Sequence, residues 1–121
     1  MSKYNNKIVE IDGVQFHSKI EASYFQQLKW AKESKTIKSF ELQPKFVLQD
    51  KFKKNGKHHR AITYIADFKV IGLDNKVEII DIKGAPLTET FKIKRKLFEY
   101  KFPELSLKCL YYTKAKGWYE R

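Results

Sequence analysis

The segment from residue 64 to residue 84 constrains the fold of this chain most, because it reads as one hairpin that carries two aspartates. Both of its arms are rich in β-forming residues, and Gly-Leu-Asp-Asn-Lys at 72–76 supplies turn chemistry between them. A three-residue loop that ends with Asn75 in the left-handed conformation pairs Asp67 directly with Asp81. A two-residue loop would put the two aspartates on opposite faces of the sheet. We prefer the longer loop, because a tight primed turn favours Asn-Gly or Asp-Gly over Asp-Asn.

Direct pairing of Asp67 with Asp81 is costly unless a cation lies between them. Directly opposed residues have Cβ atoms roughly 5 Å apart, and two carboxylates at that separation repel by about 3 kcal/mol at an effective dielectric near 20. Lys83 follows Asp81 by two residues, so its side chain points to the same face. The pattern therefore indicates a cation-binding site, although two solvated aspartates near strand ends would give the same periodicity.

The rest of the chain predicts two helices among several strands. A short strand or hairpin is expected from Val9 to Phe16 around Asp12-Gly13. The expected helices cover 18–34 and 88–102, and the expected strands cover 36–42, 46–52, 61–71, 77–82 and 105–113. This α-β-β-β-α-β order predicts an α/β (α+β) fold, with a mixed central sheet flanked by helices, in one domain spanning residues 1–121.

Charge narrows the choice of partner. Lys and Arg number 25 against 14 Asp and Glu, for a formal net charge of +11. Such an excess on an aromatic-rich domain favours a polyanion, most simply nucleic acid, with solubility or anionic lipid as the other interpretations. The charge is concentrated at 51–60, where Asn55-Gly56 predicts a hairpin tip with basic arms, and at 92–96. The candidate nucleic-acid-binding residues are Lys53, Lys54, Lys57, Arg60, Lys92, Lys94, Arg95 and Lys96.

Cysteine content and hydropathy favour an intracellular location. Cys109 is the one cysteine and lies in an apolar run, so we expect a buried, reduced thiol and no disulfide framework. The first six residues lack the apolar core of a signal peptide, and no segment approaches the ~20 apolar residues that span a bilayer. We therefore expect a cytoplasmic protein with no membrane partner.

A third carboxylate, Glu21, falls within the apolar stripe of the first expected helix. The stripe consists of Ile20, Tyr24, Phe25, Leu28 and Ala31. A carboxylate that faces the core costs free energy unless it is paired, hydrogen-bonded or bound to a metal. Ser18-Lys-Ile-Glu21 also matches a capping box, which would give this glutamate a structural role at the helix start. The two roles do not exclude each other.

The second expected helix is basic between two apolar lines. One line consists of Phe91, Phe98 and Phe102, and the other of Ile93, Leu97 and Tyr100. Apolar surface on two sides suggests that this helix packs on the sheet and makes a second contact, such as one with another subunit.

The residues from Asp67 to Gly84 resemble the core motif of the PD-(D/E)XK nucleases. An Asp at a strand terminus is followed by a turn and then by an apolar strand that ends in Asp81-Ile-Lys83-Gly84. The resemblance runs from about residue 16 to residue 103 and implies a restriction-endonuclease-like core. It also implies an enzyme that hydrolyses phosphodiester bonds.

The resemblance assigns a role to each of these residues. Asp67 and Asp81 would bind Mg²⁺ or Mn²⁺, with the backbone carbonyl of Ile82 as a further ligand and the Glu21 carboxylate binding directly or through water. Mg²⁺ prefers hard oxygen ligands and is commonly held by one or two carboxylates. Lys83 would orient the attacking water and help it lose its proton.

The substrate implied by the resemblance is DNA. Size, charge and the lack of an accessory domain look most like phage-borne nucleases and Holliday-junction resolvases, which implies branched DNA, a homodimer and the host-cell cytoplasm. Family members often place a basic residue of the second helix over the active site, and Lys92 and Lys94 are the candidates here. The alternatives are a non-cleaving nucleic-acid-binding accessory module on a nuclease fold, and a single-strand or RNA nuclease. The intact acidic pair and Lys83 argue against the first alternative.

Overall fold

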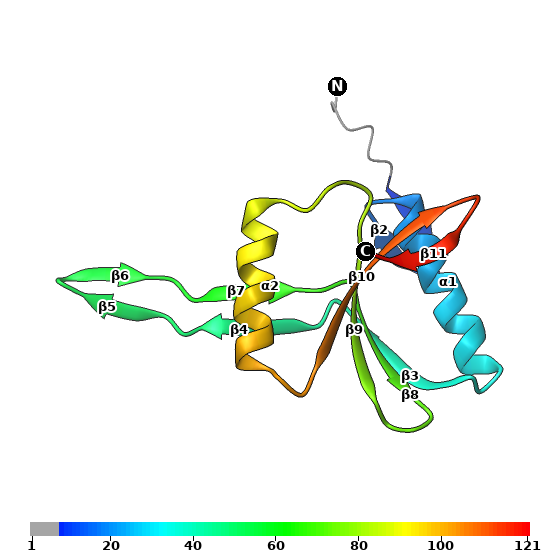
Figure 1. Ribbon diagram of the computed structural model, residues 1–121, viewed down its shortest axis with the longest axis horizontal. Coiled ribbons are helices and arrows are strands. Elements are labelled where there is room, and N and C mark those ends of the chain that lie inside the picture. The colour runs from blue at the N-terminus through cyan, green and yellow to red at the C-terminus, as the bar shows by residue number, and fades with distance from the viewer. Residues whose placement is uncertain (1–7) are drawn as a thin grey trace.

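The computed structural model describes residues 8–121, and these form a mixed α+β structure with a five-stranded sheet and two helices (Figure 1). The elements in chain order are β1 (Val9–Ile11), β2 (Val14–Phe16), α1 (Lys19–Glu33), β3 (Ile37–Leu42), β4 (Lys45–Gln49), β5 (Phe52–Lys54), β6 (Lys57–His59), β7 (Ile62–Ile65), β8 (Phe68–Gly72), β9 (Val77–Ile82), α2 (Glu89–Lys101), β10 (Ser106–Thr113) and β11 (Gly117–Glu120). The predicted α/β class is confirmed, while the expectation about the first six residues lies outside the described part of the chain.

The main sheet has the strand order β11-β10-β9-β8-β3 and is mixed. Its β9–β10 pair is parallel, because the chain crosses over through α2, and its other three pairs are antiparallel. Neighbouring residues of β9 point to opposite faces, so Ile79 packs in one core cluster and Ile80 in the other. The two helices therefore cover opposite faces of the sheet.

Helix α1 begins where its sequence signals predict. Ser18 has an extended backbone, and its Oγ accepts a hydrogen bond from the Glu21 N–H at 3.1 Å. The other bond of the expected capping box, in which the Ser18 N–H would donate to the Glu21 carboxylate, is not formed at the start of this described helix. Phe25 and Leu28 are buried and pack against Phe68 of β8, so the predicted stripe does face the sheet.

Helix α2 is capped by Thr88, whose Oγ1 accepts from the Phe91 N–H at 3.1 Å. One of the two predicted apolar lines is its packed face, because Phe91 and Phe98 are buried against the sheet and the β4–β7 ribbon. The other line is mostly outside, with Ile93 60% and Tyr100 88% exposed. Of the second line, Leu97 is partly buried and packs against this core, whereas Ile93 and Tyr100 stay outside.

Two expected strands are each interrupted. The stretch 46–52 ends its pairing at Gln49 and resumes at Phe52, because β4 pairs with β7 whereas β5 pairs with β6. The stretch 61–71 breaks at Ala66 and Asp67, where the chain passes from the β4–β7 ribbon into the main sheet. The order α-β-β-β-α-β is incomplete, because it leaves out the last strand, β11, and the hairpins at 9–16 and 51–60. Both hairpins form, as their turn residues predict.

Candidate active site

The β8–β9 hairpin has the register that the three-residue loop predicts. Its four ladder pairs run from Ile71 opposite Val77 to Phe68 opposite Ile80. The Gly72 N–H donates to the Lys76 carbonyl at 2.9 Å and closes the loop Leu73–Asn75, in which Asn75 has φ of 68°. Extending this register by one residue pair places Asp67 opposite Asp81. The expectation about the turn is therefore confirmed.

Asp67 lies just beyond the end of β8, and its side chain completes the ladder. The Ala66 N–H lies outside the main sheet and donates to the Pro44 carbonyl at 3.1 Å. The Ile82 N–H on β9 donates instead to Asp67 Oδ2, at 2.6 Å. A strand residue directs its N–H and C=O to the same side, so the Ile82 carbonyl also lies on the Asp67 side of β9. This placement agrees with the predicted position of a backbone ligand.

Asp81 is a buried charge with two direct partners. The residue is 7% exposed, its Oδ2 accepts a short hydrogen bond from the Tyr64 hydroxyl, and Lys83 Nζ lies 3.5 Å from the same oxygen. Burial, followed by the charge of Asp81, raises the pKa of Tyr64 far above its ordinary value, so the phenol keeps its proton and acts as the donor. Tyr64 and Lys83 therefore hold Asp81 from two sides.

The two aspartates interact electrostatically. Burial, then the charge of Asp81 and a side-chain hydrogen bond with it, raise the pKa of Asp67 from 3.8 to about 8. The Ile82 N–H acts in the opposite direction but does not cancel the rise. Burial also raises the pKa of Glu21, which His17 lowers and Asp81 raises further. The three carboxyl groups are thus electrostatically linked, and the aspartate pair most closely.

Lys83 lies between Asp81 and an aromatic ring. Its Nζ is 3.6 Å from the centroid of Phe91, on α2, which gives the ammonium a cation–π contact in addition to the ion pair. An open cavity of about 400 Å³ adjoins both charged groups. It is lined by Thr63, Tyr64, Ile65, Asp81, Lys83, Thr88, Thr90, Phe91 and Lys94. The cavity gives solvent and a ligand access to the carboxylate and to the lysine.

The structure separates the two candidate basic residues of α2. Lys94 lines the cavity beside Asp81, whereas Lys92 is exposed and pairs with Glu89 at 3.3 Å. Arg95 is engaged elsewhere, because its Nε lies 3.1 Å from Glu99 and its guanidinium approaches the Cys109 sulfur at 3.8 Å. Lys94 is therefore the basic residue of this helix that lines the cavity.

The donor set suits a hard divalent cation with few protein ligands. Within residues 8–121, no three His, Cys, Asp or Glu side chains are grouped closely enough to hold a metal ion. Glu21 is therefore not grouped with the two aspartates, and its role as a direct or water-mediated ligand stays a prediction. Asp67 and Asp81 remain, with the Ile82 carbonyl beside them, and Mg²⁺ commonly uses one or two carboxylates while keeping its waters. The raised pKa of Asp67 marks a carboxylate pair whose full ionisation a cation would favour.

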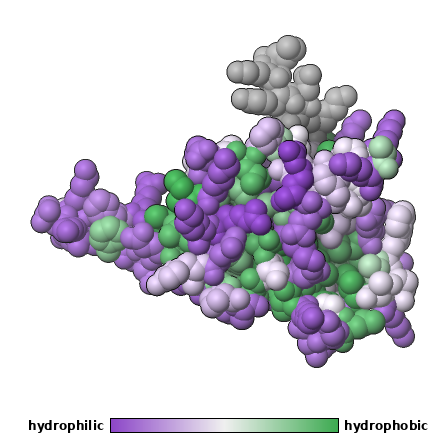
Figure 2. All heavy atoms as spheres, in the orientation of Figure 1, coloured by the Kyte–Doolittle hydropathy of each residue, from purple (hydrophilic) through white to green (hydrophobic). Residues whose placement is uncertain are grey.

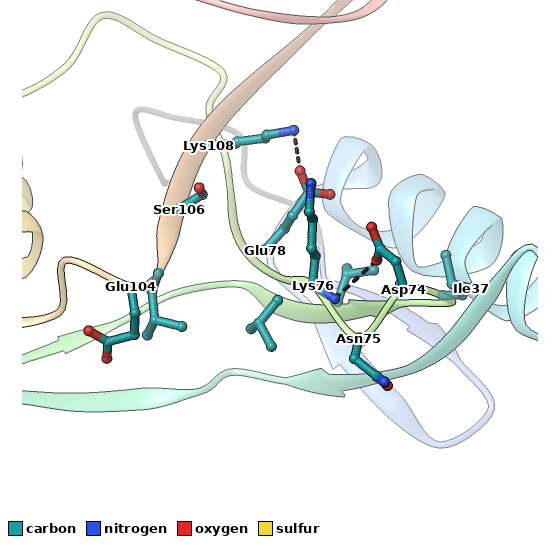
Figure 3. Close-up of a pocket in the computed structure, with 12 residues that line it drawn as sticks. Ile37, Asp74, Asn75, Lys76, Glu78, Glu104, Ser106 and Lys108 are labelled. Atoms are coloured by element: carbon teal, nitrogen blue, oxygen red, sulfur yellow. Dashed lines mark hydrogen bonds and ion pairs between the residues drawn. The ribbon is translucent and has the colours of Figure 1, made fainter.

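A larger cavity, of about 780 Å³, lies at the other end of the β8–β9 hairpin (Figure 3). Two of its polar contacts are internal: Lys108 pairs with Glu78, and Asp74 Oδ1 accepts from the Lys76 N–H at 3.0 Å. The residues that face it come from the start of β3, from β8, β9 and the turn between them, and from the start of β10 and the segment that leads into it. Size therefore favours this cavity, but the two interacting carboxyl groups favour the aspartate pair.

The remaining basic candidates lie on the exposed β5–β6 hairpin and on the outer side of α2. Lys53, Lys54, Lys57 and Arg60 belong to the first group, and Lys96 is exposed on the second. His58 and His59 are opposite Lys53 and Phe52 in adjacent pairs of the hairpin. Cys109 is a free, buried thiol as predicted, and burial raises its pKa.

Tyr64 and Phe91 are the site residues that sequence reasoning missed. Both aromatics also read as core residues, and each does pack in the core with its ring. The signal for Tyr64 is its place three residues before Asp67 at the end of a β-rich run, which suggests a hydroxyl near the acidic pair. No local signal marks Phe91, since its contact with Lys83 depends on how α2 crosses the sheet.

Comparison with known proteins finds one family. A family model described as "Protein of unknown function (DUF1064)" matches residues 1–117. No curated protein and no solved structure matches the chain. Neither helix within residues 8–121 has the length and hydropathy needed to cross a membrane.

Proposed function

The chain belongs to the DUF1064 family of proteins of unknown function, and we propose that it is a metal-dependent DNA endonuclease of the PD-(D/E)XK type. The observation that carries the proposal is the interacting Asp67–Asp81 pair, in which Asp81 is buried, lies beside Lys83 and lines an open cavity. Perturbed carboxyl groups of this kind concentrate at functional sites. The net charge of +11 supports a polyanionic substrate.

Each side chain of the site has a task in phosphodiester hydrolysis. Asp67, Asp81 and the Ile82 carbonyl would hold Mg²⁺ or Mn²⁺, with Glu21 acting through water. The bound cation would neutralise charge that develops on the phosphodiester. Lys83, fixed by Asp81 and by a ring, orients the attacking water and promotes loss of its proton.

Two residues around the catalytic groups have supporting tasks. Tyr64 fixes the Asp81 carboxylate through its hydroxyl, which donates to Oδ2, the oxygen that Lys83 also contacts. Lys94 lines the cavity and supplies a positive charge for a neighbouring phosphate. Both tasks need only the contacts that the side chains already make or the space that they already line.

Branched DNA is the substrate that we propose first. The basis is the resemblance of a small, basic nuclease domain to phage-borne nucleases and junction resolvases. Cutting two strands of a branch together needs two active sites, so the proposal includes a homodimer that works in the cytoplasm of the host cell.

Cleavage assays test the proposal directly. Purified protein is incubated with a four-way junction, a linear duplex and a single strand, in Mg²⁺, in Mn²⁺ and in EDTA. We expect metal-dependent cutting, with the junction cut fastest, and loss of cutting in Asp81→Asn and in Lys83→Ala. Asp12→Asn and Lys76→Ala are the matched controls, since both positions are exposed and belong to turns away from the cavity.

The outcomes separate the candidate functions. Tight binding to DNA without cutting in either metal would support the non-cleaving accessory module instead. Cutting of single strands or of RNA in preference to duplex would support the nuclease activity but contradict branched DNA as the substrate. Equal cutting by Asp81→Asn and by the wild type would contradict the proposed site.

A further inference from the structure

The β5–β6 hairpin projects from the body of the molecule. We call residues 51–60 the arm; it consists of β5, the turn Asn55-Gly56 and β6 (Figure 1). Asn55 and Gly56 have φ of 50° and 74°, so the turn is the tight primed type that suits a twisted ribbon. All six strand residues of the arm are exposed. Because its strand residues are exposed, the hairpin gains little stability from packing against the rest of the protein. Packing therefore does not explain why the hairpin projects from the fold.

The arm carries positive charge alone. Its basic residues are Lys51, Lys53, Lys54, Lys57 and Arg60, and positions 51–60 contain no Asp or Glu. None of these five takes part in an ion pair within residues 8–121. Lys54 lies directly opposite Lys57, an arrangement that destabilises an isolated hairpin. Figure 2 shows the hydrophilic surface of this projection, interrupted near its middle by an apolar patch.

Two aromatic rings stiffen the arm near its base. Phe52 and His59 are ladder partners, and their rings stack with centroids 4.6 Å apart and an angle of 14° between planes. On the same face, towards the tip, lie Lys54 and Lys57. The stack therefore fixes the direction of a ribbon whose end carries the opposed lysines.

The arm continues the strand that forms one wall of the candidate active site. Thr63, Tyr64 and Ile65 of β7 line the cavity beside Asp81, and a single residue, Ala61, separates the arm from β7. Six residues separate Tyr64 from His58, which corresponds to roughly 20 Å along a ribbon. This spacing corresponds to about six base pairs, since successive phosphates of one strand are ~3.4 Å apart along the helix axis.

From these observations we propose that the arm is a duplex-binding element that enters a groove of DNA and contacts phosphates about six base pairs from the site of cleavage. A two-stranded β-ribbon fits the major groove, which is about 12 Å wide. The proposal rests on the proposed function for the position of the cut, but the binding itself requires no cleavage. Lysines without protein partners are the groups that phosphate contacts use.

Salt dependence of binding provides the test. Affinity for a 30-base-pair duplex is measured in EDTA at several salt concentrations, for the wild type and for K53Q/K54Q/K57Q. The matched control is K32Q/K76Q/K114Q, which removes the same charge from exposed lysines outside the arm. Each phosphate contact contributes about 0.9 to the slope of log K against log salt, so we expect the arm variant to lose about 2 to 3 from the slope and roughly 10- to 100-fold in affinity.

A second variant removes the arm without disturbing its base. Gln49 and Ile62 are ladder partners, so replacing residues 50–61 by Asn-Gly closes β4 onto β7 with a two-residue turn. We expect this variant to melt at nearly the wild-type temperature. The slope of log K against log salt is also measured on duplexes of different lengths. The shortest duplex on which this variant reaches its maximum slope should be about six base pairs shorter than the corresponding duplex for the wild type.

Several results would overturn the proposal. An arm variant that binds with the wild-type slope would exclude phosphate contacts, and an equal loss in the control variant would show only an effect of net charge. Binding of the wild type to anionic vesicles but not to duplex would replace DNA with a lipid surface. Loss of binding in the arm variant, combined with no cutting by the wild type, would instead support the arm and contradict the nuclease.

Discussion

The Asp81 carboxylate is buried although it lies beside a second carboxyl group, and three neighbours explain how the fold accommodates it. Tyr64 donates a hydrogen bond, Lys83 supplies a positive charge, and Asp67 takes up a proton more readily than an ordinary aspartate. Burial of a charge is costly unless it is paired and hydrogen-bonded. The ion pair with Lys83 and the hydrogen bond from Tyr64 compensate for the burial of the Asp81 carboxylate. The repulsion between the two carboxyl groups contributes to the raised pKa of Asp67.

Asp67 should make the stability of the metal-free protein depend on pH. Its folded-state pKa of about 8 lies above the ordinary value of 3.8, so its contribution is fully present below about pH 4 and is lost as the pH rises towards 8. We expect the free energy of unfolding of the wild type to fall relative to Asp67→Asn, by up to about 1.4 kcal/mol per pH unit between pH 5 and 7. Urea unfolding in EDTA at several pH values measures the difference.

The asparagine variant is a suitable reference because its amide oxygen can still accept from the Ile82 N–H, while it carries no charge at any pH. Parallel stability curves for the two proteins would mean that Asp67 titrates normally. In that case the proposed carboxylate pair would be wrong.

Tyr64→Phe should weaken the fold and the site together. The substitution removes one hydroxyl from a buried carboxylate and leaves the ring packing intact, so we expect a loss of about 1–3 kcal/mol in the free energy of unfolding and slower cleavage. Tyr111→Phe is the matched control, because its hydroxyl makes only a 3.5 Å contact with the Ala85 carbonyl. Equal losses in the two variants, measured by urea unfolding, would contradict a special role for Tyr64.

At the scale of elements, local signals were sufficient wherever a turn or a cap decides the structure. Asn75 and the turn Asp12-Gly13 adopt positive φ as their residue types predict, and both helices begin after their caps. The breaks near Asp50 and at Ala66 were not predicted, because β-rich runs stand on both sides of each of them. These breaks depend on which strand becomes the partner, and partners come from distant parts of the chain.

The loop at Asn75 can be tested through its left-handed conformation. Asn75→Ala should lower the free energy of unfolding by about 1 kcal/mol, because alanine has a Cβ and no side-chain polar group to favour φ of 68°. Asn75→Gly should be neutral or slightly stabilising. The comparison by thermal unfolding uses the same position for test and control. A more stable alanine variant would indicate a different loop in solution.

Phe98 joins α2 to the ribbon that carries Tyr64. Its side chain is fully buried and its ring contacts those of Phe46 and Tyr64, so Phe98→Ala should cost about 3–5 kcal/mol in the free energy of unfolding. Ile93→Ala, on the exposed side of the same helix, should change it by less than about 0.5 kcal/mol. Guanidinium unfolding of both variants measures the two costs, and similar values would mean that α2 packs differently.

For the whole molecule, the sequence predicted which residues form the acidic site better than it predicted how many. Asp67, Asp81 and Lys83 come from one hairpin, so a single register brings them together. Glu21 comes from a helix on the opposite face of the sheet, and its distance from the pair depends on how α1 docks. Its place outside the immediate group could therefore not be read from a local pattern.

The outer line of α2 offers a test of the proposed homodimer. Ile93 and Tyr100 are seven residues apart, lie on the same side of the helix and are 60% and 88% exposed, so they supply aromatic and aliphatic surface of the kind that anchors interfaces. We expect sedimentation equilibrium to detect dimers of the wild type, and Tyr100→Glu to weaken the dimer by about 30-fold, equivalent to ~2 kcal/mol. Trp30→Glu, an exposed aromatic on the other helix, should leave association unchanged. A wild type that stays monomeric while cutting both strands of a junction would contradict the dimer, because each monomer would then have to cut the two strands in turn.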